Sequence, residues 1–155
     1  MKYSIVRVNK TNYPMFDNMI FYRINGRERN KNEQADIQID QAIYQTLEDK
    51  NLYIFAAQAD DKFIGWISAV YIPKVGRTNG RGHLFIDELW VRSDCRRNGV
   101  AHTLMEKADA ISKELNTLGL RLYVSVDNDD AILLYKKCGY GNQHEALFME
   151  KEQIK

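Results

Sequence analysis

A short basic turn, Arg96-Arg97-Asn98-Gly99-Val100-Ala101, carries the clearest chemistry in the sequence. It follows an apolar run that predicts a strand and precedes a periodic run that predicts a helix. The first backbone N–H groups of a helix lack partners within the helix, and with the helix dipole they form a site for anions that needs no metal. Glycine permits close approach of the backbone to a ligand. The turn is therefore either an anion site or an ordinary surface turn whose arginines face water.

Two adjacent acids, Asp87 and Glu88, lie within the preceding apolar run. Successive side chains of a strand point to opposite faces, so only one of the two can easily face a ligand unless a β-bulge intervenes. A carboxylate is costly to bury in a central strand without a partner. The pair is therefore a candidate for acid–base chemistry, and the alternative is that each acid is solvated or held in a salt bridge.

Hydrophobic periodicity predicts the elements that position these residues. Alternating or continuous apolar runs predict strands at 3–8, 52–59, 62–72, 83–92, 120–126 and 146–150. Helical spacing predicts helices from about 12, over 36–49, from 98 to about 118 and over 129–138. The polar segment 25–34 and the glycine-rich segment 73–82 are expected to be loops.

The predicted order of elements is βααβββαβαβ, which indicates an α/β (α+β) fold. The unit of strand, helix and strand over 83–126 implies a right-handed parallel crossover beside antiparallel hairpins. We therefore expect a mixed, mostly antiparallel sheet with helices on both faces. A chain of 155 residues with 45% hydrophobic residues fits one domain over residues 1–155.

A second motif lies in the run from Asn128 to Tyr140. Together the two motifs resemble the GNAT superfamily of N-acetyltransferases, over roughly residues 54–140. The first family motif, Gln/Arg-x-x-Gly-x-Gly/Ala, is matched by Arg96, Gly99 and Ala101. The second, an Asn, an Ala three residues on and a Leu-Tyr ahead of a Gly-Phe/Tyr, is matched at positions 128, 131, 134–135 and 139–140.

The resemblance implies acetyl-coenzyme A as cofactor. Its pyrophosphate would be held by the backbone N–H groups of the turn, with Arg96, Arg97 or Lys137 near the phosphates. Its pantetheine arm would pair like an extra strand with the backbone of Leu89, Trp90 and Val91. The complete set of expected cofactor-binding residues is Leu89, Trp90, Val91, Arg96, Arg97, Asn98, Gly99, Val100, Ala101, Asn128, Ala131, Tyr135 and Lys137.

The resemblance also implies catalytic roles. Tyr135 falls at the family position of the acid that protonates the departing thiolate, and the alternative is an aromatic residue packed on an apolar face. Some family members place the base, a glutamate, on the following strand, where this chain has Tyr123, so Glu88 and Asp87 become the candidate bases. The run Ile86–Val91 resembles polyamine and small-amine acetyltransferases, and Tyr71–Lys74 locally resembles aminoglycoside 3-N-acetyltransferases.

Composition limits the other possibilities. The formal charge of +1 gives no overall attraction to nucleic acid or to an anionic membrane. No apolar run approaches the roughly 20 residues of a membrane span, so we expect a cytoplasmic protein. The two cysteines, Cys95 and Cys138, lie far apart and fit free thiols, and no metal site is predicted.

The expected function is acetyl transfer to a primary amine of a small molecule or peptide. The alternative is a catalytically silent module of the same fold that binds or senses acyl-coenzyme A. The residues that select the acceptor are expected in the loops 25–34 and 141–145, and the resemblance makes a homodimer plausible.

Overall fold

The computed structural model describes residues 1–76, 78–142, 144 and 146–153. By its internal contacts the chain divides into two compact units, Met1–Tyr123 and Val124–Lys155, and each is described by itself. The assignment of the chain to a single domain stays a prediction. The expected acceptor loop at 141–145 lies partly outside the described residues, as does one residue of the loop at 73–82.

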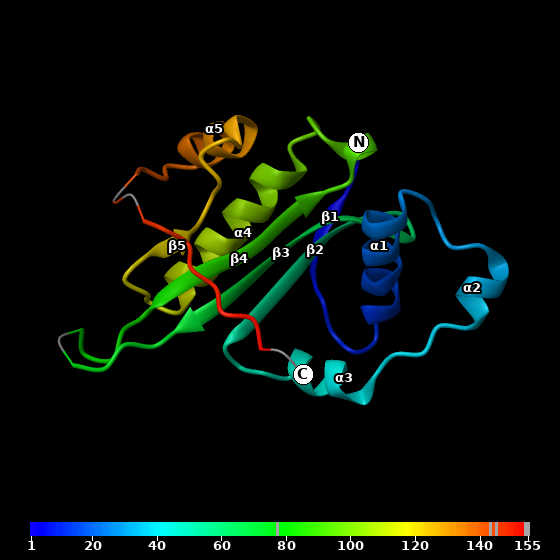
Figure 1. Cartoon of the computed structure of the whole chain (residues 1–155), viewed down its shortest axis with the longest axis horizontal. Helices are drawn as coiled ribbons and strands as arrows, with labels where there is room; N and C mark the ends of the chain where they lie inside the picture. Colours follow the sequence, from blue (N-terminus) through cyan, green and yellow to red (C-terminus); the bar gives the residue numbers. More distant parts are fainter. Residues whose placement is uncertain (77, 143, 145, 154–155) are drawn as a thin grey trace. The chain divides into compact units, whose positions relative to one another are not determined.

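All the strands of the described residues belong to the first unit and form one sheet in the order β1-β2-β3-β4-β5 (Figure 1). The first four strands pair antiparallel, and β5 pairs parallel with β4. The strands are β1 (Ser4–Arg7), β2 (Leu52–Ala59), β3 (Lys62–Ile72), β4 (His83–Val91) and β5 (Leu120–Leu122). The prediction of a mixed, mostly antiparallel sheet is confirmed.

Helices and strands follow one another as expected from β1 to α5, except for the additional short helix α2 and the 3-10 turn η1. The first unit contains α1 (Tyr13–Asn25), α2 (Lys31–Ala35), α3 (Gln41–Leu47), the 3-10 turn η1 (Ser93–Cys95) and α4 (Val100–Glu114). The second unit contains α5 (Asp129–Lys137). Pro14 lies in the first turn of α1, where the missing N–H group of proline removes no helical hydrogen bond.

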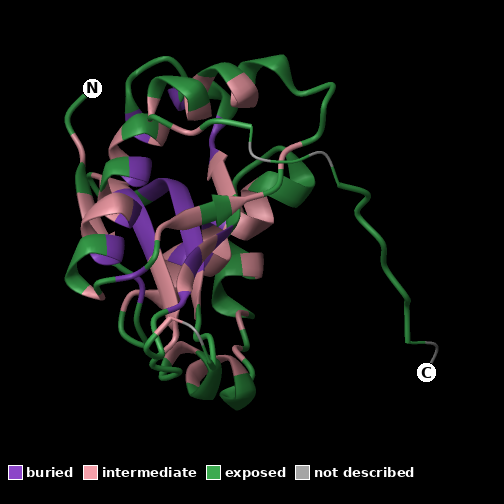
Figure 2. Ribbon diagram, turned by 90° about the vertical axis from the view of Figure 1, so that its left-hand side faces the viewer, coloured by how far each residue is buried: buried purple, intermediate pink, exposed green. Residues whose placement is uncertain are grey.

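Both faces of the sheet are covered within the first unit. Phe16 of α1 lies edge-on to the ring of Trp66 on β3, with ring centroids 5.4 Å apart. On the opposite face of the sheet, α4 packs against the first four strands. Lys107 of α4 lies 4.9 Å from the ring centroid of Phe55 on β2. Figure 2 shows buried residues on the strands and on the inner sides of the helices. The prediction of helices on both faces is confirmed.

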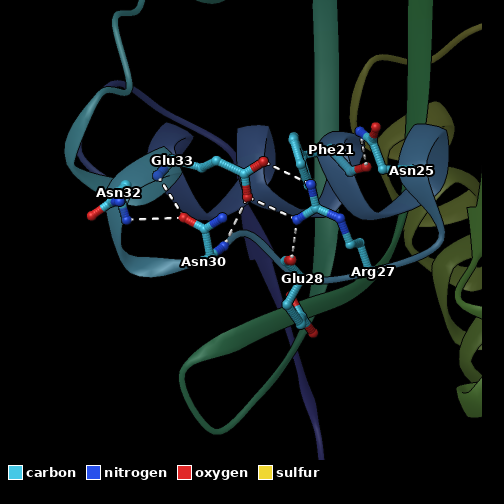
Figure 3. A network of polar contacts seen from close by, with 7 residues as sticks. All are labelled: Phe21, Asn25, Arg27, Glu28, Asn30, Asn32 and Glu33. Atoms are coloured by element: carbon cyan, nitrogen blue, oxygen red, sulfur yellow. Dashed lines mark hydrogen bonds and ion pairs between the residues drawn. The ribbon is translucent and has the colours of Figure 1, made fainter.

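The segment 25–34, predicted to be a loop, ends in a short helix. The side chain of Asn30 accepts hydrogen bonds from the backbone N–H groups of Asn32 and Glu33, and the Glu33 carboxylate accepts one from the N–H of Asn30. This reciprocal capping box starts α2. Arg27 adds two bonds to the same carboxylate, at 2.7 and 2.8 Å (Figure 3).

Two predicted strands differ from the observed structure. β5 ends at Leu122 rather than Val126, because its pairing with β4 ends at Ile86. The strand predicted at 146–150 is wrong, since these residues have no regular structure and Leu147 and Met149 are 90% and 86% exposed. The described part of the second unit contains no strand to which this segment could pair, and a strand without a partner is not stable.

Candidate functional site

The middle of β4 contains a β-bulge at the acidic pair. Ile86 pairs with Ala69 of β3 and Glu88 pairs with Ser68, so Asp87 is the extra residue without a partner on β3. Because Ala69 and Ser68 are neighbours and face opposite sides, the bulge also turns Glu88 to the side opposite Ile86. The simple alternation expected for adjacent acids therefore does not hold here.

Glu88 lies on the face covered by α1. Its Oε1 atom accepts a hydrogen bond from Nη1 of Arg23, a residue of α1, at 3.0 Å. Both side chains remain partly exposed, at 48% for Glu88 and 41% for Arg23. Asp87 is exposed as well. The structure thus places Glu88 in a salt bridge, one of the two alternatives that the sequence left open, and keeps both carboxylates accessible to a ligand.

Beyond the bulge, β4 has an open edge. Leu89, Trp90 and Val91 pair with β3, whereas β5 pairs only with residues 84–86. On the β5 side, the backbone from Asp87 to Val91 therefore has no strand partner within the described residues. The expected pairing of a pantetheine arm with this backbone requires such an edge. One carbonyl is already engaged, because Nε of Arg96 donates to the Val91 oxygen at 3.2 Å.

The turn between β4 and α4 has the conformation of an anion site. Arg97 and Gly99 both adopt positive φ angles, 59° and 79°, and α4 begins directly after Gly99. Since glycine has no side chain, Gly99 makes no capping hydrogen bond, and the first amides of α4 are not covered by a cap. Val100 itself is 2% exposed, so it is buried and anchors the start of the helix.

Local contacts fix this turn. The Asn98 amide donates to the carbonyl oxygens of Cys95 and Arg96 at 3.2 and 3.0 Å. The first turn of α4 is tied to the sheet, because Thr103 Oγ1 lies 3.0 Å from the Tyr3 hydroxyl. Arg96, Arg97 and Asn98 are exposed and Ala101 is half-buried. The expected residues 96–101 are thus brought together with the edge of β4 in the first unit.

The remaining expected residues lie on α5 of the second unit. Oδ1 of Asn128 accepts a hydrogen bond from the Ala131 N–H at 3.2 Å and so caps the helix, while the NH₂ group of Asn128 takes no part in the cap. Tyr135 is half-buried, and burial, followed by the nearby Cys138, raises the pKa of its hydroxyl above the usual value of 10.0. Lys137 is exposed.

Other chemistry finds little support. Cys95 is buried, and burial followed by the neighbouring Asp94 raises the pKa of its thiol, so it is a poor nucleophile. The described residues contain no group of three or more His, Cys, Asp or Glu side chains that could hold a metal ion. None of the helices in the described part of the chain is long and apolar enough to cross a membrane.

Sequence reasoning missed the contacts that surround these residues. Arg92, directly after β4, binds Glu28 at 2.8 Å and Asp94 at 3.0 Å, and its guanidinium lies 3.7 Å above the ring of Tyr22. Together these contacts connect the segment after α1 to η1, directly before the basic turn at residues 96–101. An arginine after a strand gives no signal for partners more than 60 residues away in the chain.

Comparison with known proteins gives a consistent family. Residues 18–140 match the model described as "Acetyltransferase (GNAT) family". One curated relative is "GCN5-related N-acetyltransferase 4, chloroplastic" from Arabidopsis thaliana, which is 32% identical over 74 residues. That alignment covers 46% of this chain and only 25% of the relative.

Solved structures share the fold. An aminoglycoside acetyltransferase from an uncultured soil metagenomic sample, solved with sisomicin, has a TM-score of 0.79 at 15% identity, with 98% of this chain and 97% of that one covered. AAC(6')-Iy, solved with the bisubstrate analogue CoA-S-monomethyl-acetylneamine, has a TM-score of 0.73 at 18% identity, with 99% and 100% covered. At these identities the likeness concerns the fold alone.

Proposed function

This chain belongs to the GNAT family of acetyltransferases, and from that premise we propose that it transfers an acetyl group directly to a primary amine of a small molecule or peptide. Acetyl-coenzyme A is the acetyl donor. The observation that carries the proposal is the turn after β4, where Gly99 at a φ of 79° leaves the start of α4 without a side-chain cap. An uncapped helix start beside two exposed arginines suits an anionic cofactor.

Within the first unit, the turn after β4 and the edge of β4 support the binding of this cofactor. The backbone amides at the start of α4 would hold the pyrophosphate, and Arg97 is exposed beside them. Arg96 donates to the Val91 carbonyl through Nε, so its two Nη groups would be the donors for a phosphate. The open edge of β4 at residues 89–91 would pair with the amide-bearing pantetheine arm. From the second unit, Asn128 would donate through its NH₂ group.

Two proton movements complete the reaction. The bound cofactor supplies an activated thioester. A carboxylate oxygen of Glu88 or Asp87 removes the proton that the attacking amine must lose, directly or through water. The hydroxyl of Tyr135 donates a proton to the departing sulfur. A tyrosine hydroxyl is protonated at neutral pH, and burial raises the pKa of Tyr135 further above 10.0.

The variant Tyr135→Phe tests the assignment of the acid. It removes the hydroxyl and keeps the ring, so we expect the maximal rate to fall by about tenfold or more while coenzyme A binding, measured by calorimetry, changes little. In the wild type we expect the rate to fall above pH 10, where the Tyr135 hydroxyl loses its proton. The variant has no such hydroxyl and should not show this fall. Full activity of the variant across this pH range would contradict the role.

The base is identified by comparing Glu88→Gln with Asp87→Asn. The substitution at the base lowers the rate at neutral pH and the other does not. If the protein binds coenzyme A but a broad panel of amines releases no thiol, the chain is instead a binding module of the same fold.

A further inference from the structure

The guanidinium of the salt bridge between Arg23 and Glu88 lies over the ring of Trp66, which is only 1% exposed. The guanidinium carbon of Arg23 is 5.1 Å from the ring centroid of Trp66, within the range of a cation–π interaction. The ring of Trp90 lies 5.1 Å from that of Trp66. A carboxylate above an aromatic surface is a general arrangement for binding organic cations, and here a cation of the chain itself occupies it.

Across from Glu88 on the neighbouring strand lies a polar group without a partner in the part of the chain that the structure describes. Ser68 is opposite Glu88 on β3, and opposite residues of paired strands share a face. Ser68 is 8% exposed, and its hydroxyl makes no hydrogen bond to any part of the chain that the structure describes. A buried hydroxyl without a partner is unfavourable and uncommon in native proteins, so it points to a ligand that supplies the missing bond.

We propose that Glu88, Ser68 and the two tryptophans form the subsite for the ammonium group of the acceptor, and that Arg23 fills this subsite until the acceptor displaces it. The inference rests on the proposed function and specifies its acceptor as a cationic amine. Arg23 is then a specificity-determining residue that competes with the substrate.

The chemistry of the two cations explains the exchange. The guanidinium of Arg23 is planar and tethered to α1, and it binds Glu88 without bonding to the Ser68 hydroxyl. An ammonium group is compact and has three rotatable donors, so it can bind the carboxylate and the serine oxygen together. After displacement Glu88 is released from Arg23 and lies close to the amine, which is compatible with either Glu88 or Asp87 acting as the base.

The subsite has a built-in reporter, because the two tryptophans of the chain, Trp66 and Trp90, both belong to it. Intrinsic tryptophan fluorescence therefore measures binding there without turnover. The probe is spermidine, titrated without cofactor into wild-type protein and Arg23→Gln. To bind, spermidine must break the exposed ion pair and the cation–π contact of Arg23, and Arg23→Gln lacks both. We therefore expect the dissociation constant for spermidine to be about tenfold lower in the variant.

Arg7→Gln is the control. Arg7 on β1 also places its guanidinium over an aromatic ring, 5.4 Å from the ring centroid of Tyr53, and it donates to the Leu52 carbonyl oxygen at 3.4 Å. The control therefore loses the same charge and a cation–π contact away from the tryptophans, and its affinity for spermidine should equal that of the wild type. Ser68→Ala should weaken binding about tenfold without a loss of thermal stability, because its hydroxyl makes no bond in the free protein.

An unchanged or weaker affinity in Arg23→Gln, or an unchanged affinity in Ser68→Ala, overturns the proposal. Thiol release measured on the same variants separates this failure from failure of the proposed function. If wild type and Arg23→Gln turn over with the same KM, the proposed acetyl transfer stands and the proposed subsite is contradicted. If Arg23→Gln binds spermidine more tightly but no amine is acetylated, the subsite is supported and the proposed acetyl transfer is contradicted.

Discussion

The substitution Gly99→Ala tests whether the turn after β4 binds the cofactor. Gly99 has a φ of 79°, a conformation that costs a residue with a Cβ atom about 1–2 kcal/mol. The added Cβ would lie 3.6 Å from the Tyr3 hydroxyl, an ordinary contact, so strain rather than collision determines the cost. We expect the free energy of unfolding to fall by about 1–2 kcal/mol, which lowers Tm by about 2–4 °C for each kcal/mol.

Gly26→Ala is the control for this strain. Gly26 ends α1 with a φ of 69°, and a Cβ atom added there would meet no atom within 4 Å, so the variant should lose a similar free energy of unfolding. Only Gly99→Ala relieves its strain by rotating the amides that begin α4. We therefore expect its dissociation constant for coenzyme A, measured by calorimetry, to rise by about tenfold, or about 1.4 kcal/mol, while Gly26→Ala binds normally.

The reasoning is refuted if Gly99→Ala loses stability as Gly26→Ala does and still binds coenzyme A like the wild type. The positive φ would then serve only to direct the chain from β4 into α4. Gly99→Glu extends the series, because it adds a negative charge at the turn and is expected to abolish binding of the anionic cofactor.

Three further predictions concern the surroundings of the site. Arg92→Met should lower the free energy of unfolding by about 1–3 kcal/mol in a denaturant titration, because it removes a buried arginine and its two ion pairs. The loss is modest because the carboxylates of Glu28 and Asp94, which are 43% and 54% exposed, can be solvated by water instead. Hydrogen bonds, of which that from Arg27 has the largest effect, lower the pKa of Glu33 to about 2. The contribution of Glu33 to stability is therefore present above pH 4.5 and is lost as the pH falls through about 2. An NMR titration of the Glu33 carboxyl should give this midpoint, and Arg27→Gln should raise it. The buried Cys95 should react with a thiol reagent only when the protein unfolds, and reaction of the native protein at the rate of a free thiol would contradict its burial.

Local patterns in the sequence predicted much of the fold. The two central strands, Leu52–Ala59 and Lys62–Ile72, have the predicted bounds, because long runs of aromatic and β-branched residues separated by Asp60-Asp61 specify a hairpin. The family was recognised from two short motifs and is confirmed by the match over residues 18–140. The α2 helix was missed although its signal, Asn30 with Glu33 three residues on, is visible in the sequence.

The unpredicted features depend on contacts between distant segments. The bulge at Asp87 arises from the register between β3 and β4, which alternation along one strand does not reveal. The pairing of β5 ends at Ile86, directly before the bulge residue, so the apolar residues after Leu122 do not extend the strand. The salt bridge of Glu88 joins residues 65 positions apart in the chain. The roles assigned to the site residues, the homodimer and the cytoplasmic location stay predictions.

The central claim is that the chain acetylates a primary amine, and one measurement tests it most directly. Purified protein is incubated with acetyl-coenzyme A and a panel of polyamines, aminoglycosides, amino acids and peptides, while free thiol and acetylated amine are quantified together. We expect at least one amine to give equal amounts of both products, with a lower rate for Tyr135→Phe. Coenzyme A binding without either product from any amine would contradict the claim.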